Sequence, residues 1–308
     1  MLDDLLQKTS RTFALTIPLL REPVRTEVGV AYLLFRVADT LEDATLWARD
    51  RKVRELRDLA RFLEGDSGET AGALAVRWAD APPLEHAGYR ELLAAFPEVA
   101  RAAGALPPDA RALVVEHTAR TCRAMAEFAA REEERGGLRL RDVADLKAYC
   151  YAVAGIVGEM LTELFLLDDA RLGAIAPELR RDAARFGEAL QLVNILKDAA
   201  ADSVEGRTFL PPSVARGEVF ALARLDLVAA AGYCARLETA GADGSLVAFT
   251  ALPLLLAKAT LDRVEALGPG VKIGRAEVGA IVAELQAAVL RREVEALLNR
   301  TVVPIRGS

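Results

Sequence analysis

The chain has 308 residues, of which 52% are hydrophobic and 27% are charged, so it is long enough to bury a sizeable core in one large domain or two modest ones. Its net charge of −6 argues against a nucleic-acid partner, because such a partner calls for a basic surface. Aromatic residues make up only 6%, and Ala, Leu, Arg and Glu dominate, which favours helix over strand.

The cysteines and the apolar segments bear on the cellular location. Cys122, Cys150 and Cys234 are widely separated and odd in number, which fits neither a disulfide framework nor a zinc site. The N-terminal sequence lacks the basic-then-apolar plan of a signal peptide, and no run of about 18 uninterrupted apolar residues occurs. We therefore expect reduced thiols in a cytoplasmic protein without a transmembrane anchor.

Hydrophobic periodicity predicts helices along the whole chain. In the first half they are expected at 3–20 with an interruption near Ser10, at 24–47, 48–64, 71–79, through Glu91 and Phe96, and at 109–134. In the second half they are expected at 140–165, 178–202, 215–235, 244–267 and 275–300. The acidic run at 132–134 is expected on solvated surface, and Asp142 is expected to cap the helix at 140–165. No segment keeps the period-two pattern of a strand.

The helix predicted at 24–47 carries two aspartates, Asp39 and Asp43, at a spacing of four residues. At this spacing they share one helix face and repel each other. The pair is therefore expected beside a cation, and two candidates fit. One is Arg36, which lies one turn earlier on the same face, and the other is a divalent metal ion.

A second acidic pair, Asp198 and Asp202, follows in the helix predicted at 178–202 and shares a face with Gln191 and Asn194. Each pair taken alone is most simply a solvated face, because acidic residues are mostly exposed. Two such pairs facing each other across a helical cavity would instead offer hard oxygen ligands suited to Mg²⁺. The duplication of the pair favours this interpretation.

Two other kinds of site are excluded by spacing. Neither His86 nor His117 has a Glu three residues before it, so a di-iron helical bundle is not expected. Gly268 and Gly270 could be taken for the first two glycines of a dinucleotide-binding motif, but Ile273 occupies the position of the third glycine. No strand is predicted before them either. A dinucleotide fingerprint is therefore rejected.

The two acidic stretches, together with three others, resemble motifs of the squalene and phytoene synthases. Asp39-Thr40-Leu41-Glu42-Asp43 is similar to the first aspartate-rich motif, in the form typical of squalene synthases, and residues 194–202 (NILKDAAAD) are similar to the second. The further matches are residues 10–13 (SRTF), 149–158 (YCYAVAGIVG) and 206–211 (GRTFLP). After about residue 215 the resemblance says little.

The resemblance implies an all-α, single-domain isoprenoid-synthase-type helical bundle around a central cavity, spanning residues 1–308. It implies an enzyme, a prenyltransferase most like a bacterial squalene synthase, that joins two farnesyl diphosphates head to head through presqualene diphosphate to squalene. Within the family, phytoene, dehydrosqualene, presqualene diphosphate or hydroxysqualene remain alternative products. A non-catalytic helical scaffold is the alternative outside enzymes.

The resemblance also implies roles for individual residues. Tyr149 would accept the proton in the first half-reaction, and a packing tyrosine is the alternative. The ligands implied for Mg²⁺ are Asp39, Asp43, Asn194, Asp198 and Asp202, of which the four aspartates are also expected to be catalytic. The residues implied for the substrate diphosphates are Arg11, Arg36, Gln191, Asn194, Lys197 and Arg207.

NADPH is the expected reductant, and its phosphates would contact Lys197 and Arg207. Lys197 stands where the family usually has an arginine. A lysine ammonium contacts a phosphate as a point charge, whereas an arginine can make a bidentate contact. Gly155 and Gly158 require a close approach in the helix at 140–165, either by another helix or by an extended prenyl chain. Peripheral contact with the membrane that receives the product is a further expectation.

Overall fold

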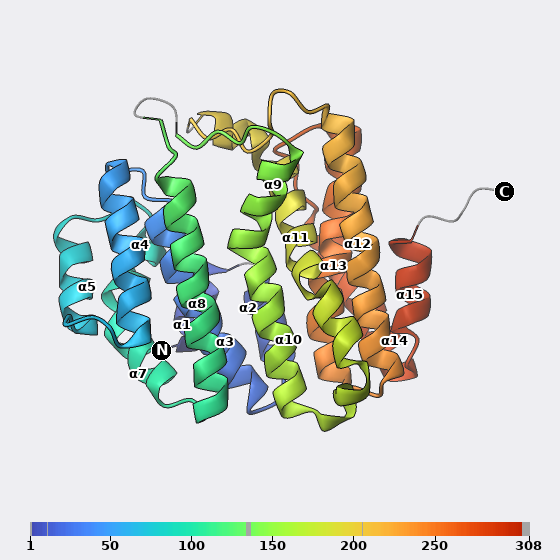
Figure 1. Cartoon of the computed structure of the whole chain (residues 1–308). Helices are drawn as coiled ribbons and strands as arrows, with labels where there is room; N and C mark the ends of the chain where they lie inside the picture. The colour runs from blue at the N-terminus through green and yellow to red at the C-terminus, as the bar shows by residue number, and fades with distance from the viewer. Residues whose placement is uncertain (1, 11, 134–136, 205, 304–308) are drawn as a thin grey trace. The chain divides into compact units, whose positions relative to one another are not determined.

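The computed structural model of the protein describes residues 2–10, 12–133, 137–204 and 206–303. The chain forms two compact units, Met1–Pro18 with Glu22–Glu134 and Leu19–Arg21 with Arg135–Ser308. Both units are helical (Figure 1), and the described residues contain no β-strand, so the predicted all-α class is confirmed. The expectation of a single domain over 1–308 stays a prediction.

The first unit is organised around α3, which packs against α4, α7 and α8. Its apolar residues Leu34, Val37 and Leu41 are fully buried, as their helical spacing predicts. The helices of this unit are α1 (Leu2–Thr9), α2 (Phe13–Thr16), α3 (Val24–Glu42), α4 (Arg49–Glu64), α5 (Ala71–Asp80), α6 (Ala87–Ala94), α7 (Phe96–Gly104) and α8 (Pro108–Ala129).

The helix expected at 24–47 ends earlier than predicted, at Glu42. Asp43 is its C-cap residue, and the Asp43 N–H donates to the Asp39 carbonyl at 2.8 Å. The chain then leaves the helix axis and reaches Trp47, whose indole Nε1 donates to the carbonyl of Ala81 at 2.8 Å. The two aspartates nevertheless lie one helical turn apart.

Charged side chains join the helices of the first unit. Glu55 on α4 is fully buried and accepts hydrogen bonds at 2.9 Å from both Trp78 Nε1 and Arg77 Nε on α5. Beyond the end of α8, Glu132 pairs with Lys52 at 3.0 Å, and each of these side chains is only 11% exposed. The prediction of a solvated surface is therefore wrong for Glu132, because a long-range partner compensates its burial.

The second unit is organised around α11, which packs against α10, α12 and α13. Its helices are α9 (Val143–Cys150), a π-helical turn (Tyr151–Gly155), α10 (Ile156–Asp168), a 3₁₀ turn (Ala170–Ile175), α11 (Ala176–Val204), α12 (Arg216–Thr239), α13 (Gly244–Leu267), α14 (Arg275–Arg291) and α15 (Val294–Thr301). Asp142 caps α9 as predicted, because its side chain accepts a hydrogen bond from the Asp145 N–H.

A close approach of two helix backbones explains small residues in this unit. A Cβ on Gly158 of α10 would lie 2.1 Å from the carbonyl oxygen of Ala183 on α11. A Cβ on Gly187 would lie 2.0 Å from the carbonyl oxygen of Ala154, within the π-helical turn. Helix packing therefore explains why position 158 is a glycine. The close contact at Ala154 lies in the π-helical turn, which interrupts the helix expected at 140–165.

Two helical stretches in the second unit, Val143–Asp168 and Gly244–Leu267, are long and apolar enough to cross a membrane by length and composition alone. More than half of each lies buried within the protein, 56% and 67% respectively. Core helices of a folded protein meet the same criteria of length and composition as membrane spans. The expected cytoplasmic location therefore stays a prediction.

Candidate active site

The first acidic motif lies in the first unit, at the C-terminal end of α3. Asp39 lies beside Arg36, whose Nη1 is 3.3 Å from Asp39 Oδ2, and both side chains are half-buried. Asp43 follows one turn later as the C-cap residue. Of the two cations considered from the sequence, Arg36 thus contacts Asp39, and this contact leaves the prediction of a metal ion open.

Aromatic side chains surround Arg36. Its Nε and Nη2 donate to the Tyr32 hydroxyl at 3.3 and 3.2 Å, and the Tyr32 hydroxyl donates to the Thr9 carbonyl at 3.0 Å. The guanidinium carbon lies 5.5 Å from the ring centroid of Tyr32 and 5.8 Å from that of Tyr89 on α6. These contacts on several sides hold the Arg36 guanidinium in one position and orientation, as a site that binds an anion with a preorganised positive charge requires.

Burial raises the pKa of Asp39 to about 6, and the neighbouring charges modify this effect in opposite directions. Arg36 lowers the pKa because it favours the carboxylate, whereas Asp43 raises it because like charges repel. A second cation beside Asp39 would stabilise its carboxylate form, because a nearby positive charge offsets the free-energy cost of burying a negative charge.

The second acidic motif lies in the second unit, along α11. Lys197 Nζ donates to Asn194 Oδ1 at 3.1 Å and lies 3.1 Å from Asp198 Oδ2. One turn further, Asp202 Oδ1 is 3.3 Å from Nη2 of Arg207 in the following loop. Gln191 lies earlier on the same helix, so α11 carries all five of the predicted residues Gln191, Asn194, Lys197, Asp198 and Asp202.

Tyr149 lies at the end of α9, just before the π-helical turn, and is 3% exposed. Its ring stacks on that of Phe209, with centroids 4.8 Å apart and an angle of 24° between the planes. The guanidinium carbon of Arg207 lies 5.7 Å from the Phe209 centroid. Tyr149 and the Asp202 end of the second motif are thereby connected within the second unit.

The structure thus brings together Arg36, Asp39 and Asp43 in the first unit, and Asn194, Lys197, Asp198, Asp202 and Arg207 in the second. Arg11 lies outside the described residues. The described ranges contain no group of three or more His, Cys, Asp or Glu side chains placed to hold a metal ion by themselves.

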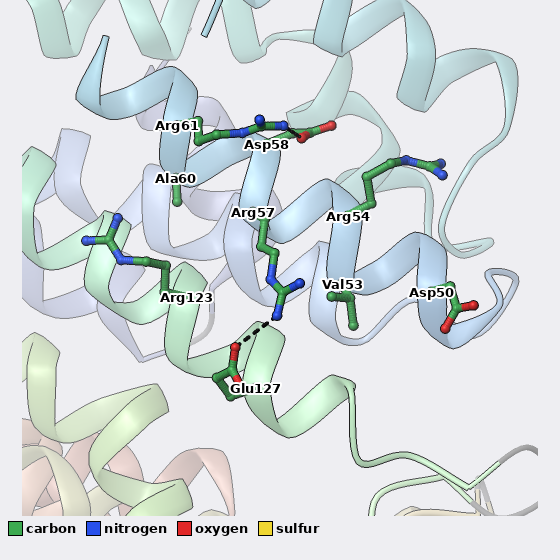
Figure 2. Close-up of a pocket in the computed structure, with 9 residues that line it drawn as sticks. All are labelled: Asp50, Val53, Arg54, Arg57, Asp58, Ala60, Arg61, Arg123 and Glu127. Atoms are coloured by element: carbon green, nitrogen blue, oxygen red, sulfur yellow. Dashed lines mark hydrogen bonds and ion pairs between the residues drawn. The ribbon is translucent and has the colours of Figure 1, made fainter. Parts of the chain in front are cut away.

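A surface groove of about 560 Å³ between α4 and α8 is separate from these residues (Figure 2). It is lined by Arg54, Arg57, Arg61 and Arg123, together with acidic side chains. Arg57 pairs with Glu127 at 2.9 Å across the groove, as the dashed line in Figure 2 shows. Among the predicted site residues that the structure describes, none lines this groove.

Sequence reasoning missed three residues that contact the predicted ones: Tyr32, Tyr89 and Phe209. Tyr32 could have been found, because it lies four residues before Arg36 on the same helix face. Phe209 belongs to the 206–211 match, but nothing in the sequence indicates that it meets Tyr149. Tyr89 lies on another helix and carries no local signal.

Comparisons with known proteins agree with this set of motifs. The model of the family described as squalene/phytoene synthase matches residues 6–227. The squalene synthase of Yarrowia lipolytica is 31% identical over 85% of this chain and 60% of its own length. The squalene synthase of Saccharomyces cerevisiae is 30% identical over 68% of this chain and 45% of its own length. The chain thus spans about half the length of the curated relatives it matches.

Solved structures agree at the level of the fold. A structure described as TcSQS with the ligand BPH1237 matches with a TM-score of 0.70 and 25% identity, covering 98% of this chain and 96% of the other. A dehydrosqualene synthase in complex with a ligand matches with a TM-score of 0.57 and 20% identity, covering 94% and 95%. From the family match over residues 6–227, which includes both acidic motifs and Tyr149, we conclude that the chain belongs to the squalene/phytoene synthase family.

Proposed function

We propose that the protein is a prenyltransferase that condenses two farnesyl diphosphates head to head, through presqualene diphosphate, to squalene. The observation that carries the proposal is the repeated pairing of carboxylates and cations. Asp39 and Asp43 accompany Arg36 at the C-terminal end of α3, and Asp198 and Asp202 accompany Lys197 and Arg207 at α11. Membership of the squalene/phytoene synthase family supports farnesyl diphosphate as the ligand of these paired groups.

The carboxylates would hold Mg²⁺, and Asn194 would add an amide oxygen. The donor set fits, because these are hard oxygen ligands, and a cation would relieve the buried charge of Asp39, whose pKa is raised to about 6. Magnesium ions would supply stabilisation of the negative charge that develops on the departing diphosphate.

The basic side chains would contact the diphosphates directly. Arg36 is held in one orientation by Tyr32 and Asp39 and can offer a fork of N–H donors to phosphate oxygens. Lys197 and Arg207 already contact carboxylates of the second motif and would bind the same ligand as those carboxylates. Gln191 would add hydrogen bonds, and Arg11 is proposed from the 10–13 match alone.

Tyr149 would accept the proton released when the cyclopropyl ring of presqualene diphosphate forms. Its burial supports the role, because a carbocation intermediate must be kept from water. NADPH would supply the hydride for the second half-reaction, with its phosphates at Lys197 and Arg207. A product as apolar as squalene makes peripheral contact with a membrane part of the proposal.

Binding of an unreactive farnesyl diphosphate analogue by calorimetry, with and without Mg²⁺, tests the proposal. We expect saturable binding that requires Mg²⁺ and that is weakened by Asp198→Asn. Asp50→Asn is the matched control, because Asp50 is 88% exposed and lies outside both motifs. A helical scaffold would give no Mg²⁺-dependent binding, and that result would overturn the proposal.

A further inference from the structure

Phe209 covers one face of the Tyr149 ring. The two centroids are 4.8 Å apart at an angle of 24°, and the residues are 8% and 3% exposed. Offset stacking at this separation favours one relative orientation of two rings. The direction of the Tyr149 phenol therefore depends on where the chain holds Phe209.

The backbone beside Phe209 is fixed by the segment that precedes α9. The N–H of Thr208 donates to the Leu138 carbonyl at 2.8 Å, and the N–H of Leu140 donates to the Thr208 carbonyl at 3.0 Å. These bonds form a parallel bridge between Arg139 and Thr208. Leu138 and Leu140 are each 1% exposed, so the bridge is anchored in the core of the second unit.

Phe209 also lies beside Arg207, whose position is tied to the second acidic motif. The Arg207 N–H donates to the Asp202 carbonyl at 2.8 Å, and its Nη2 lies 3.3 Å from Asp202 Oδ1. Its guanidinium carbon is 5.7 Å from the Phe209 centroid. Tyr149, Phe209, Arg207 and Asp202 thus form a continuous series of contacts.

We infer that Phe209 is a positioning residue, whose ring holds the Tyr149 phenol in the orientation that proton transfer requires. The inference rests on the function proposed above for Tyr149. A small misplacement of a reacting group lowers the rate of a chemical step while ground-state contacts with the substrate persist. Loss of the Phe209 ring should therefore lower kcat and leave KM nearly unchanged.

The kinetic test compares Phe209→Leu, Phe209→Tyr and Phe186→Leu in the formation of presqualene diphosphate. Phe186 is the matched control, because its ring contacts Tyr233 at 5.4 Å in the same unit and it is 6% exposed. We expect Phe209→Leu to lower kcat about tenfold or more with KM within about twofold. Phe209→Tyr, which keeps the ring, should restore most of kcat, and Phe186→Leu should leave kcat near the wild-type value.

A second measurement does not depend on turnover. In substrate-free protein with ¹³C-labelled tyrosine, assigned with Tyr149→Phe, the rate of Tyr149 ring flipping is measured from NMR line shapes. We expect faster flipping in Phe209→Leu and no change in Phe186→Leu. If Phe209→Leu does not fold, Phe209→Met takes its place under the same criteria.

Three kinetic results would overturn the inference: an unchanged kcat in Phe209→Leu, an equal loss in Phe186→Leu, or a rise in KM at constant kcat. Unchanged ring flipping would overturn it as well. If Tyr149→Phe itself turns over normally, the role proposed for Tyr149 fails instead. The flipping rates then still decide whether Phe209 holds the ring.

Discussion

At the scale of single residues, the role proposed for the first unit centres on the contact between Arg36 and Asp39. The two groups lie 3.3 Å apart, and Tyr32 holds the guanidinium from another side. Fixed charges of this kind stabilise a transition state without having to reorganise during the reaction. The Asp39 carboxylate should therefore matter to catalysis far more than to folding.

Asp39→Asn and Asp198→Asn should each lower turnover of farnesyl diphosphate by about 100-fold or more, because each removes a carboxylate that would hold the Mg²⁺ on which charge stabilisation of the diphosphate depends. Circular dichroism should show an unchanged helical content, since both side chains are partly exposed. Asp50→Asn serves as the control and should keep wild-type activity. Near-normal activity in either motif variant would contradict its proposed role as a metal ligand.

The pKa of Asp39, raised to about 6 by burial, gives a pH dependence for the metal-free protein. Because this folded-state pKa lies above the ordinary value of 3.8, the stability contributed by protonated Asp39 is fully present below about pH 4 and is lost as the pH rises through about 6. Carboxyl ¹³C NMR should show Asp39 titrating near pH 6, and Asp43→Asn should lower that pKa. Titration near pH 4 in the wild type would refute the assignment.

At the scale of helices, the sequence predicts most elements because apolar residues at helical spacing mark buried faces. The helix expected at 244–267 is observed with those bounds, and 178–202 differs by two residues at each end. The π-helical turn could not be predicted, because no local signal marks it, and the close approach of Gly187 to Ala154 within it is a tertiary contact. The early end of α3 at Glu42 likewise reflects a long-range anchor at Trp47.

Gly158→Ala tests the close approach of α10 and α11. The added Cβ would lie 2.1 Å from the Ala183 carbonyl oxygen, so the helices must separate. We expect the free energy of unfolding in urea to fall by about 3 kcal/mol or more.

Gly279→Ala on α14 is the control for Gly158→Ala, because a Cβ added at Gly279 would meet no atom within 4 Å among the described residues. Alanine in an open helix position should raise the free energy of unfolding by up to about 1 kcal/mol. Equal effects of the two substitutions on the free energy of unfolding would show that helix propensity, and not the close approach of the helices, determines the effect of Gly158→Ala.

At the scale of the whole molecule, the acidic motifs, Tyr149 and the all-α class could be predicted, because spacing and family resemblance identify them. The contacts of Arg36 with Tyr89 and of Tyr149 with Phe209 could not, because each joins residues more than 50 positions apart without a shared pattern. In the proposed reaction, the identity of the final product would depend on the shape of the substrate site and on NADPH. Neither leaves a separate motif in this chain.

Incubation of the protein with farnesyl diphosphate and Mg²⁺, with and without NADPH, followed by mass spectrometric identification of the products, tests the central claim most directly. We predict squalene when NADPH is present. Without NADPH we predict presqualene diphosphate, or a dehydrosqualene or hydroxylated side product. An identical product mixture over a wide range of NADPH concentrations would contradict the account and assign the protein as a dehydrosqualene, phytoene or presqualene diphosphate synthase.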